Sequence, residues 1–114
     1  MNVSHTSVQA KHIYRVDRFV VPEAACDEFL NNVRQTHGLL KVLPGFLFEV
    51  VLKQVSGENR YNFVTMVEWD SGVSMANAKS VVAAMHTQTH FNPQEMFDRL
   101  GIQAELVNYQ RLDS

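Results

Sequence analysis

Two histidines, His86 and His90, have a spacing that could support chemistry. On a continuous helix, residues four apart lie on one side, and two imidazoles placed in this way can bind a metal ion. The residues between them are Thr-Gln-Thr, so the His-Glu-x-x-His pattern of zinc proteases is not formed. Because histidine titrates near neutral pH, we expect acid–base catalysis by His86, a place for His90 in the same pocket, and no bound metal. The alternative is a partly exposed pair near a helix end.

The segment 60–70, RYNFVTMVEWD, determines where a pocket could form, because as a strand it would be largely apolar on both faces. Such a strand needs cover on two sides. The rest of the chain holds two substantial helical segments and one short one, which is enough to cover one face of a small sheet. We therefore expect a second copy of the chain to cover the other face. We also expect any chemistry to occur in the space between the two sheets.

The remaining segments predict the order strand, helix, strand, strand, helix, strand. Apolar alternation, helical spacing and turn residues mark the boundaries. The expected strands are 12–21, 46–55, 60–70 and 102–112, and the expected helices are 23–40, 71–86 or beyond with Ser71 as its cap, and a short 93–100 ended by Gly101. This is the order of the ferredoxin-like βαββαβ fold, an α+β class in which a four-stranded antiparallel sheet carries both long helices on one face. The bare face, being apolar, favours association.

Composition restricts the class of protein. The chain has 114 residues, 46% of them hydrophobic, and a net charge of −2 with scattered Lys and Arg, so we expect one globular domain and no nucleic-acid partner. The single cysteine, Cys26, has no second cysteine with which to form an internal disulfide. We expect residues 1–11 to form a flexible arm, residues 12–112 to form the domain, no segment to span a membrane, and the cytoplasm to be the compartment.

Three segments, IYRVDRFVVPEAACDEFL, LPGFLFEVVLKQ and NFVTMVEWDS, resemble the antibiotic biosynthesis monooxygenase family of dimeric α+β barrel proteins. The resemblance extends from His12 to Leu112, and its most specific parts are the turn at 44–46 and the strand end at 68–71. It implies a homodimer whose two sheets pack face to face. Some members of this family oxidise phenolic or anthrone-like polycyclic compounds to quinones without metal or flavin, and others degrade haem.

The activity that the resemblance implies is a cofactor-independent monooxygenase that oxidises a small aromatic or polyketide-like phenol or anthrone with O2. Such a site needs a dry pocket, aromatic walls and hydrogen-bonding groups that hold an anion. Haem-degrading members carry an asparagine on the first strand and a histidine early in the helix after the strand-end tryptophan. Here the first strand has no asparagine, and the helix has Asn77 and Lys79 where a histidine would be wanted, which disfavours haem degradation. The alternative to an enzyme is a dimer that binds a small apolar ligand or serves as an interaction module.

The resemblance also points to particular residues. Trp69 matches the family's strand-end tryptophan and would form a pocket wall, and Asn62 would hydrogen-bond a substrate oxygen. In a regular strand these two lie on opposite faces, so both line one pocket only if a bulge intervenes. The alternatives are core packing for Trp69 and a polar residue beside a turn for Asn62. Further pocket candidates are Tyr14 and Met66, and then any polar strand residue that faces the cavity: Arg15, Asp17, Glu49, Glu68 or Asn108.

Overall fold

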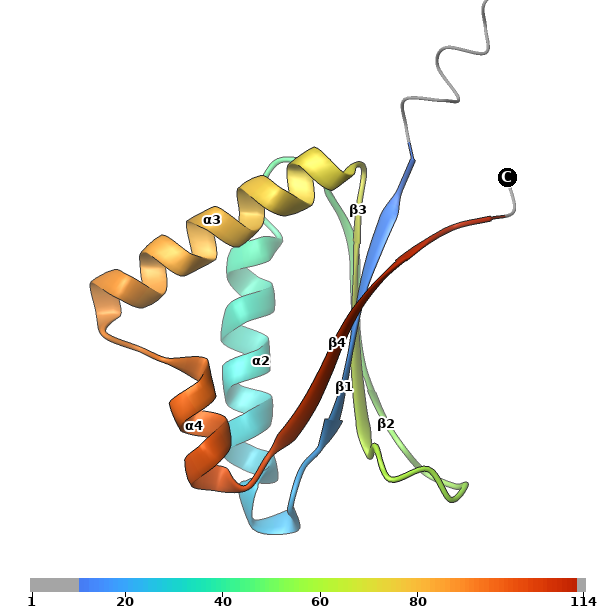
Figure 1. The fold of residues 1–114 in the computed structure, drawn as a ribbon, viewed down its shortest axis with the longest axis vertical. Helices are drawn as coiled ribbons and strands as arrows, with labels where there is room; N and C mark the ends of the chain where they lie inside the picture. The colour runs from blue at the N-terminus through green and yellow to red at the C-terminus, as the bar shows by residue number, and fades with distance from the viewer. Residues whose placement is uncertain (1–10, 113–114) are drawn as a thin grey trace, which may run out of the picture.

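The computed structural model describes residues 11–112, which form one antiparallel sheet with the helices layered on one of its faces (Figure 1). The strands are β1 (Ile13–Val20), β2 (Phe46–Lys53), β3 (Phe63–Trp69) and β4 (Gln103–Gln110). The helices are the 3-10 turn η1 (Glu23–Ala25), α2 (Cys26–Leu40), α3 (Gly72–Thr89) and α4 (Pro93–Leu100). The predicted ferredoxin-like α+β fold is confirmed, although each strand is shorter than predicted. The predicted flexible arm lies outside the described residues except for Lys11, and no helix within 11–112 could cross a membrane.

The sheet has the strand order β2-β3-β1-β4, so β1 and β3 are central. In its register Val16 of β1 lies opposite Met66 of β3 on one side and Val107 of β4 on the other. Along β3 the buried residues Phe63, Thr65, Val67 and Trp69 alternate with the partly exposed Val64, Met66 and Glu68. The buried set faces the helices, so the predicted two-sided apolar strand has helical cover on one face, while its second face is open in a single chain.

Helix α2 is attached to the sheet by one stripe of buried residues. Phe29, Val33 and His37 recur at intervals of four and therefore share a face. The ring of Phe29 meets Phe19 of β1 edge-on at 4.8 Å and Phe63 of β3 at 5.3 Å. Burial of each large apolar side chain is worth about 1.5–3 kcal/mol, so this cluster holds α2 over the two central strands.

Helix α3 has a defined cap at each end and leaves the sheet between them. Ser71 caps the helix as predicted, because its hydroxyl accepts a hydrogen bond from the backbone N–H of Ser74 at 3.2 Å. The helix ends at His90, which adopts the left-handed conformation with φ of 56°. From its start beside the end of β3, α3 runs away from the sheet, and α4 returns toward it (Figure 1). The helical layer is therefore not packed uniformly against the strands.

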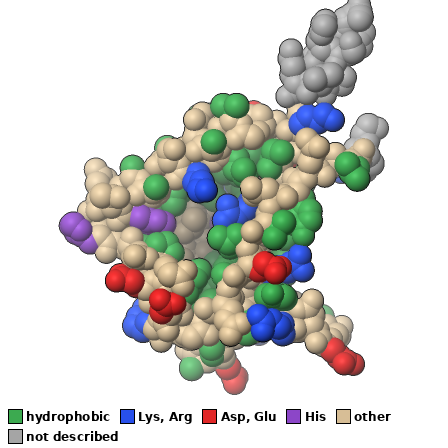
Figure 2. Space-filling view, in the orientation of Figure 1, with side chains coloured by type: hydrophobic (Ala, Val, Ile, Leu, Met, Phe, Trp, Pro, Cys, Tyr) green, Lys and Arg blue, Asp and Glu red, His purple; other side chains and the backbone are tan. Residues whose placement is uncertain are grey.

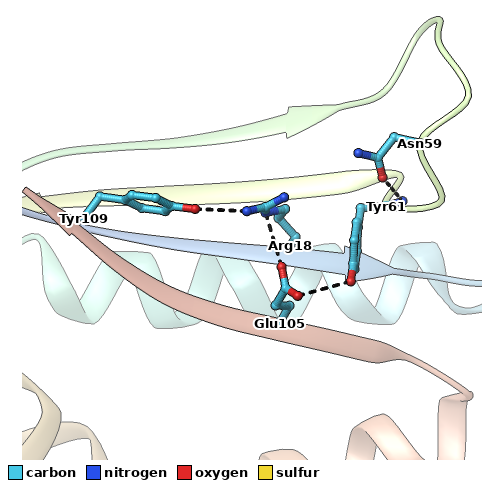
Figure 3. Close-up of polar contacts among 5 residues, drawn as sticks. All are labelled: Arg18, Asn59, Tyr61, Glu105 and Tyr109. Carbon is cyan, nitrogen blue, oxygen red and sulfur yellow. Dashed lines mark hydrogen bonds and ion pairs between the residues drawn. The ribbon is translucent and has the colours of Figure 1, made fainter.

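The open face of the sheet carries a polar group on its β1–β4 side (Figure 3). Arg18 donates to the hydroxyl of Tyr109 at 3.0 Å and forms an ion pair with Glu105 at 3.6 Å. The hydroxyl of Tyr61 donates to Glu105 at 3.5 Å, and the backbone N–H of Tyr61 donates to the side chain of Asn59. These contacts connect the loop before β3 to the edge strand β4.

Candidate functional site

Two cavities, of about 230 and 270 Å³, lie between the helical layer and the sheet. Figure 2 looks into this hollow, where hydrophobic side chains and Lys or Arg side chains gather between the helices and the strands. The cavities share five lining residues, which are Arg15 and Asp17 of β1, Thr36 and His37 of α2, and Thr65 of β3. The enclosed space thus lies on the helix-covered face. These cavities differ from the predicted space between two facing sheets, which stays a prediction. They arise because α3 leaves the sheet and creates room beneath the helices.

The walls of the cavities are largely apolar. The first cavity is walled by Leu40, Val67, Trp69, Met75, Ala78 and Val82, with Lys79 also in its lining. The second has aromatic walls from Phe19, Phe29, Phe91 and Phe97, and His86 also lines it. Apolar walls with a few polar groups at fixed places are typical of sites for small organic ligands.

A histidine–carboxylate pair borders these cavities through His37, which lines both, while its partner Glu49 lies outside both linings. His37 is only 7% exposed, and its Nδ1 lies 2.6 Å from Oε1 of Glu49 on β2. Oε2 of the same carboxylate lies 3.4 Å from Nζ of Lys41. Desolvation by burial would raise the pKa of Glu49, but the hydrogen bonds and charges of His37 and Lys41 together hold that pKa below its usual value. Glu49 is therefore a carboxylate near neutral pH.

The tautomer of His37 follows from its partner. A carboxylate can only accept hydrogen bonds, so Nδ1 of the neutral ring carries the proton and donates it to Glu49. Within residues 11–112 the ring has no other hydrogen-bond partner, which leaves Nε2 with its lone pair available. A histidine oriented by a carboxylate through one nitrogen and basic at the other is the arrangement used in general-base catalysis.

A second charged pair, Arg15 and Asp17, lines both cavities. Nε of Arg15 donates to Oδ1 of Asp17 at 2.6 Å, and both side chains are largely buried. Burial raises the pKa of the Asp17 carboxyl, and the hydrogen bond and charge of Arg15 and the charge of His37 offset this only in part. Arg15 and Asp17 therefore form an ion pair in the lining of both cavities, and the two terminal nitrogens of Arg15 have no hydrogen-bond partner within residues 11–112.

Like His86, which lines the second cavity, Trp69 is a predicted site residue that lies at a cavity. Its side chain lines the first cavity, is 2% exposed, and meets the ring of Phe46 edge-on at 5.8 Å. It is therefore both a cavity wall and part of a packed cluster, the two roles that the sequence left open. No hydrogen-bond acceptor for its indole N–H lies in the described part of the chain, although a buried indole usually has one.

Asn62 has a different position from the one predicted for it. It precedes β3, and its amide both accepts from the backbone N–H of Val21 and donates to the backbone carbonyl of Val21, each at 2.8 Å. These two bonds occupy the amide in connecting the start of β3 to the end of β1. Asn62 lines neither cavity, and the alternative of a polar residue near a turn describes it.

The other predicted residues are dispersed. Tyr14 and Met66 lie on the open face, where the Tyr14 hydroxyl donates to Glu68 at 2.9 Å. His86 lines the second cavity and stacks edge-on with Phe91 at 5.2 Å. His90 is exposed in its left-handed conformation beyond the end of α3, so the helical spacing that was to bring it beside His86 does not extend that far. No cluster of possible metal ligands occurs among residues 11–112.

Sequence reasoning missed His37, the residue with the strongest case for chemistry. A signal was available, because Phe29, Val33 and His37 follow one another at intervals of four and the first two are apolar. A histidine on the buried stripe of an amphipathic helix needs a polar partner. Its partner Glu49, and the pair Arg15 and Asp17, were among the polar strand residues named as further candidates.

Comparison with known proteins supports the fold. No protein-family model matches the sequence, and no curated protein matches it. SnoaB, a cofactor-independent oxygenase from Streptomyces nogalater, is 17% identical with a TM-score of 0.64, over 92% of this chain and 97% of that one. The haem degrader MhuD from Mycobacterium tuberculosis, solved with two haems in its active site, is 23% identical with a TM-score of 0.65, over 90% of this chain and 98% of that one. A conserved protein from Methanosarcina mazei is 19% identical with a TM-score of 0.63, over 90% of this chain and 95% of that one.

The class of protein defined here is a ferredoxin-like α+β protein with ligand-sized cavities between its helices and its sheet. Its fold is shared with an oxygenase and with a haem degrader, so the predicted structural resemblance to antibiotic biosynthesis monooxygenases is confirmed. At these identities the comparisons show the fold alone, and one fold supports many activities. An activity must be argued from the residues at the cavities.

Proposed function

We propose that this protein is a cofactor-independent oxygenase that acts on a small phenol or anthrone bound between the helices and the sheet. The observation that carries the proposal is the His37–Glu49 pair, buried at the boundary of two apolar cavities. A reaction without cofactor needs one strong contribution from the protein, which is removal of a proton to form an electron-rich anion. The pair supplies a base at the wall of two largely apolar cavities.

The chemistry balances without another reagent. Nε2 of His37 removes a proton from the substrate, and Arg15 stabilises the resulting anion. The anion reduces O2, one oxygen atom becomes the new quinone carbonyl, and the other leaves as water with two hydrogens of the substrate. An anthrone loses both from its methylene carbon, and a phenol loses one from its hydroxyl and one from the ring carbon. Trp69 and the neighbouring apolar side chains hold the flat ring and limit the entry of solvent.

We also infer that the active form is a homodimer whose open sheet faces pack together. Apolar residues occupy that face, including Val16, Val64 and Met66. The dimer would then stabilise the sheet on which the site is built.

Oxygen uptake tests the activity, with anthrone and naphthol as substrates. We expect His37→Gln to lower kcat by about 10²- to 10⁴-fold, the usual contribution of a general base. The chain offers a matched control, because His12 forms a similar pair with Glu68 at 2.8 Å on the open side of the sheet, away from the cavities. His12→Gln should leave the rate unchanged, and His86→Gln tests the earlier choice of base.

Two outcomes would contradict the proposal. If His37→Gln retains the wild-type rate while His86→Gln loses it, the base has been assigned to the wrong residue. If no substrate consumes oxygen but a thermal-shift screen of phenols, flavins and haem finds a stabilising ligand, the chain is a binding protein, since a ligand at a hundred times its Kd adds about 2.7 kcal/mol.

A further inference from the structure

The charges that line the first cavity are unequal. Arg15 and Lys79 are its permanent cations and Asp17 is its carboxyl group. Arg15 uses Nε toward Asp17, and within residues 11–112 its two terminal nitrogens have no hydrogen-bond partner. Nζ of Lys79 has no hydrogen-bond or ion-pair partner in the same part of the chain. The cavity therefore presents two sets of unused cationic donors.

The remaining titratable groups do not cancel this charge. His37 is directed at Glu49, which is also within 3.4 Å of Lys41 and lies outside the lining of the first cavity. Asp17 is paired with Arg15 at 2.6 Å, which leaves the charge of Lys79 without a paired carboxylate among the described lining residues. A guanidinium whose terminal donors have no hydrogen-bond partner, beside apolar walls, is stabilised by an anion that accepts from those donors.

We propose that the substrate is an aromatic carboxylate, whose carboxylate group pairs with Arg15 and Lys79 while its ring lies against the wall formed by Trp69. The planar guanidinium offers parallel N–H donors that match the two oxygens of a carboxylate. Lys79, on the exposed side of α3, adds a flexible point charge at the cavity. This inference rests on the proposed function, because it names the substrate class of the same site.

The two ends of the substrate would then have different roles, and Arg15 would serve both, because its terminal nitrogens hold the carboxylate and its charge stabilises the anion formed on the ring. The carboxylate end fixes the position of the molecule, and the ring carries the acidic proton to His37, which borders the same cavity. Charge recognition at Lys79 should therefore affect binding more than the chemical step. That separation distinguishes Lys79 from His37 in the kinetics.

A matched pair of ligands tests the proposal, namely hydroxynaphthoate and naphthol, which differ by the carboxylate alone. Binding is measured by calorimetry and turnover by oxygen uptake. We expect hydroxynaphthoate to bind at least tenfold more tightly than naphthol, with an advantage that decreases as NaCl is added. Lys79→Met should remove about tenfold of that advantage and leave naphthol binding unchanged. Lys53→Met, at an exposed position of β2 outside both cavities, is the control.

The outcomes separate this inference from the function on which it rests. Arg15→Lys keeps the charge beside Asp17 and should reduce the preference for the carboxylate, because a single ammonium replaces the planar donors. Equal affinity for the two ligands, or a preference unchanged in both Lys79→Met and Arg15→Lys, would overturn the inference. Selective binding of hydroxynaphthoate without oxygen uptake would support it and would contradict the oxygenase proposal.

Discussion

Two histidine–carboxylate pairs in this molecule show how surroundings decide what a pair of side chains can do. His12 and Glu68 lie 2.8 Å apart, with side chains 37% and 17% exposed. His37 and Glu49 lie 2.6 Å apart, and the histidine side chain is 9% exposed. Electrostatic interactions strengthen as solvent is excluded, so the second pair is held more firmly. Its histidine also lines both cavities.

Replacing the carboxylate of that pair should separate orientation from binding. In Glu49→Gln the amide can donate as well as accept, so it no longer requires Nδ1 of His37 to carry the proton. We expect kcat to fall by about 10- to 100-fold or more while KM changes little, because the change acts on the base and not on the walls of the cavity. Steady-state oxygen uptake measures both constants, and Glu49→Asp should restore part of kcat. A parallel rise in KM would indicate that the cavity itself had changed shape.

The buried Asp17 predicts a pH dependence of stability. Its pKa is raised in the folded protein, so over the interval between the ordinary and the raised value the folded chain binds more protons than the unfolded chain. Stability must then fall as pH rises through that interval. Asp17→Asn keeps an acceptor for Nε of Arg15 and removes this titration. We expect urea midpoints between acidic and neutral pH to fall less steeply with rising pH in the variant, and an unchanged slope would refute the assignment.

At the scale of elements, two glycines with opposite surroundings make a sharp comparison. Gly38 lies within α2, and a methyl group added there would meet nothing within 4 Å, so Gly38→Ala should stabilise the protein by about 0.5–1 kcal/mol. Gly45 has φ of +86°, and a methyl group there would overlap Ser74 and Asp70. We expect Gly45→Ala to destabilise by about 1–3 kcal/mol or more. Urea unfolding measures both, and similar effects in the two variants would contradict the turn geometry.

The elements were the part of this structure that local sequence could predict. The spacing of apolar residues and the turn at Pro44 and Gly45 predicted α2, β2 and their connection, because both signals act within a few residues. Strand ends were less accurate, since pairing partners decide them. Asn62 illustrates this, because its amide bonds to Val21, forty-one residues away in the chain, and β3 begins one residue later.

A site residue could be predicted from the sequence only where a single strand fixes its position. Trp69 could be placed by its position at the end of β3. His37 and Glu49 meet only when α2 is packed on the sheet, and periodicity alone does not supply that register. His90 lies outside the lining of both cavities because it is the left-handed residue that ends α3, a change that the spacing between histidines does not reveal.

At the scale of the whole molecule, the helices leave an apolar face of the sheet without cover. Phe48 and Leu52 of β2 are 48% and 49% exposed there. The polar group of Arg18, Glu105 and Tyr109 borders this face along β4 (Figure 3). An apolar centre with a polar border is typical of protein interfaces, and large exposed apolar patches are rare on monomers. We propose a second copy of the chain as the partner for this face, because other copies are present in every solution of the protein.

Met66→Glu should convert this protein to a monomer. Met66 lies at the centre of the open face, between Val16 of β1 and Val50 of β2, and a carboxylate there would be buried without a partner if two such faces met. Val73→Glu is the control, because Val73 is 70% exposed at the start of α3, on the other side of the sheet. Light scattering at micromolar concentration should give the mass of two chains for the wild type and for the control, and of one chain for Met66→Glu. The thermal midpoint of the wild type should rise with protein concentration, because dimerisation stabilises only the folded state. The thermal midpoint of Met66→Glu should not. A monomeric wild type would leave the apolar residues of β2 and β3 unexplained and would remove the homodimer from the proposal, while the cavities, lined by one chain, would still stand.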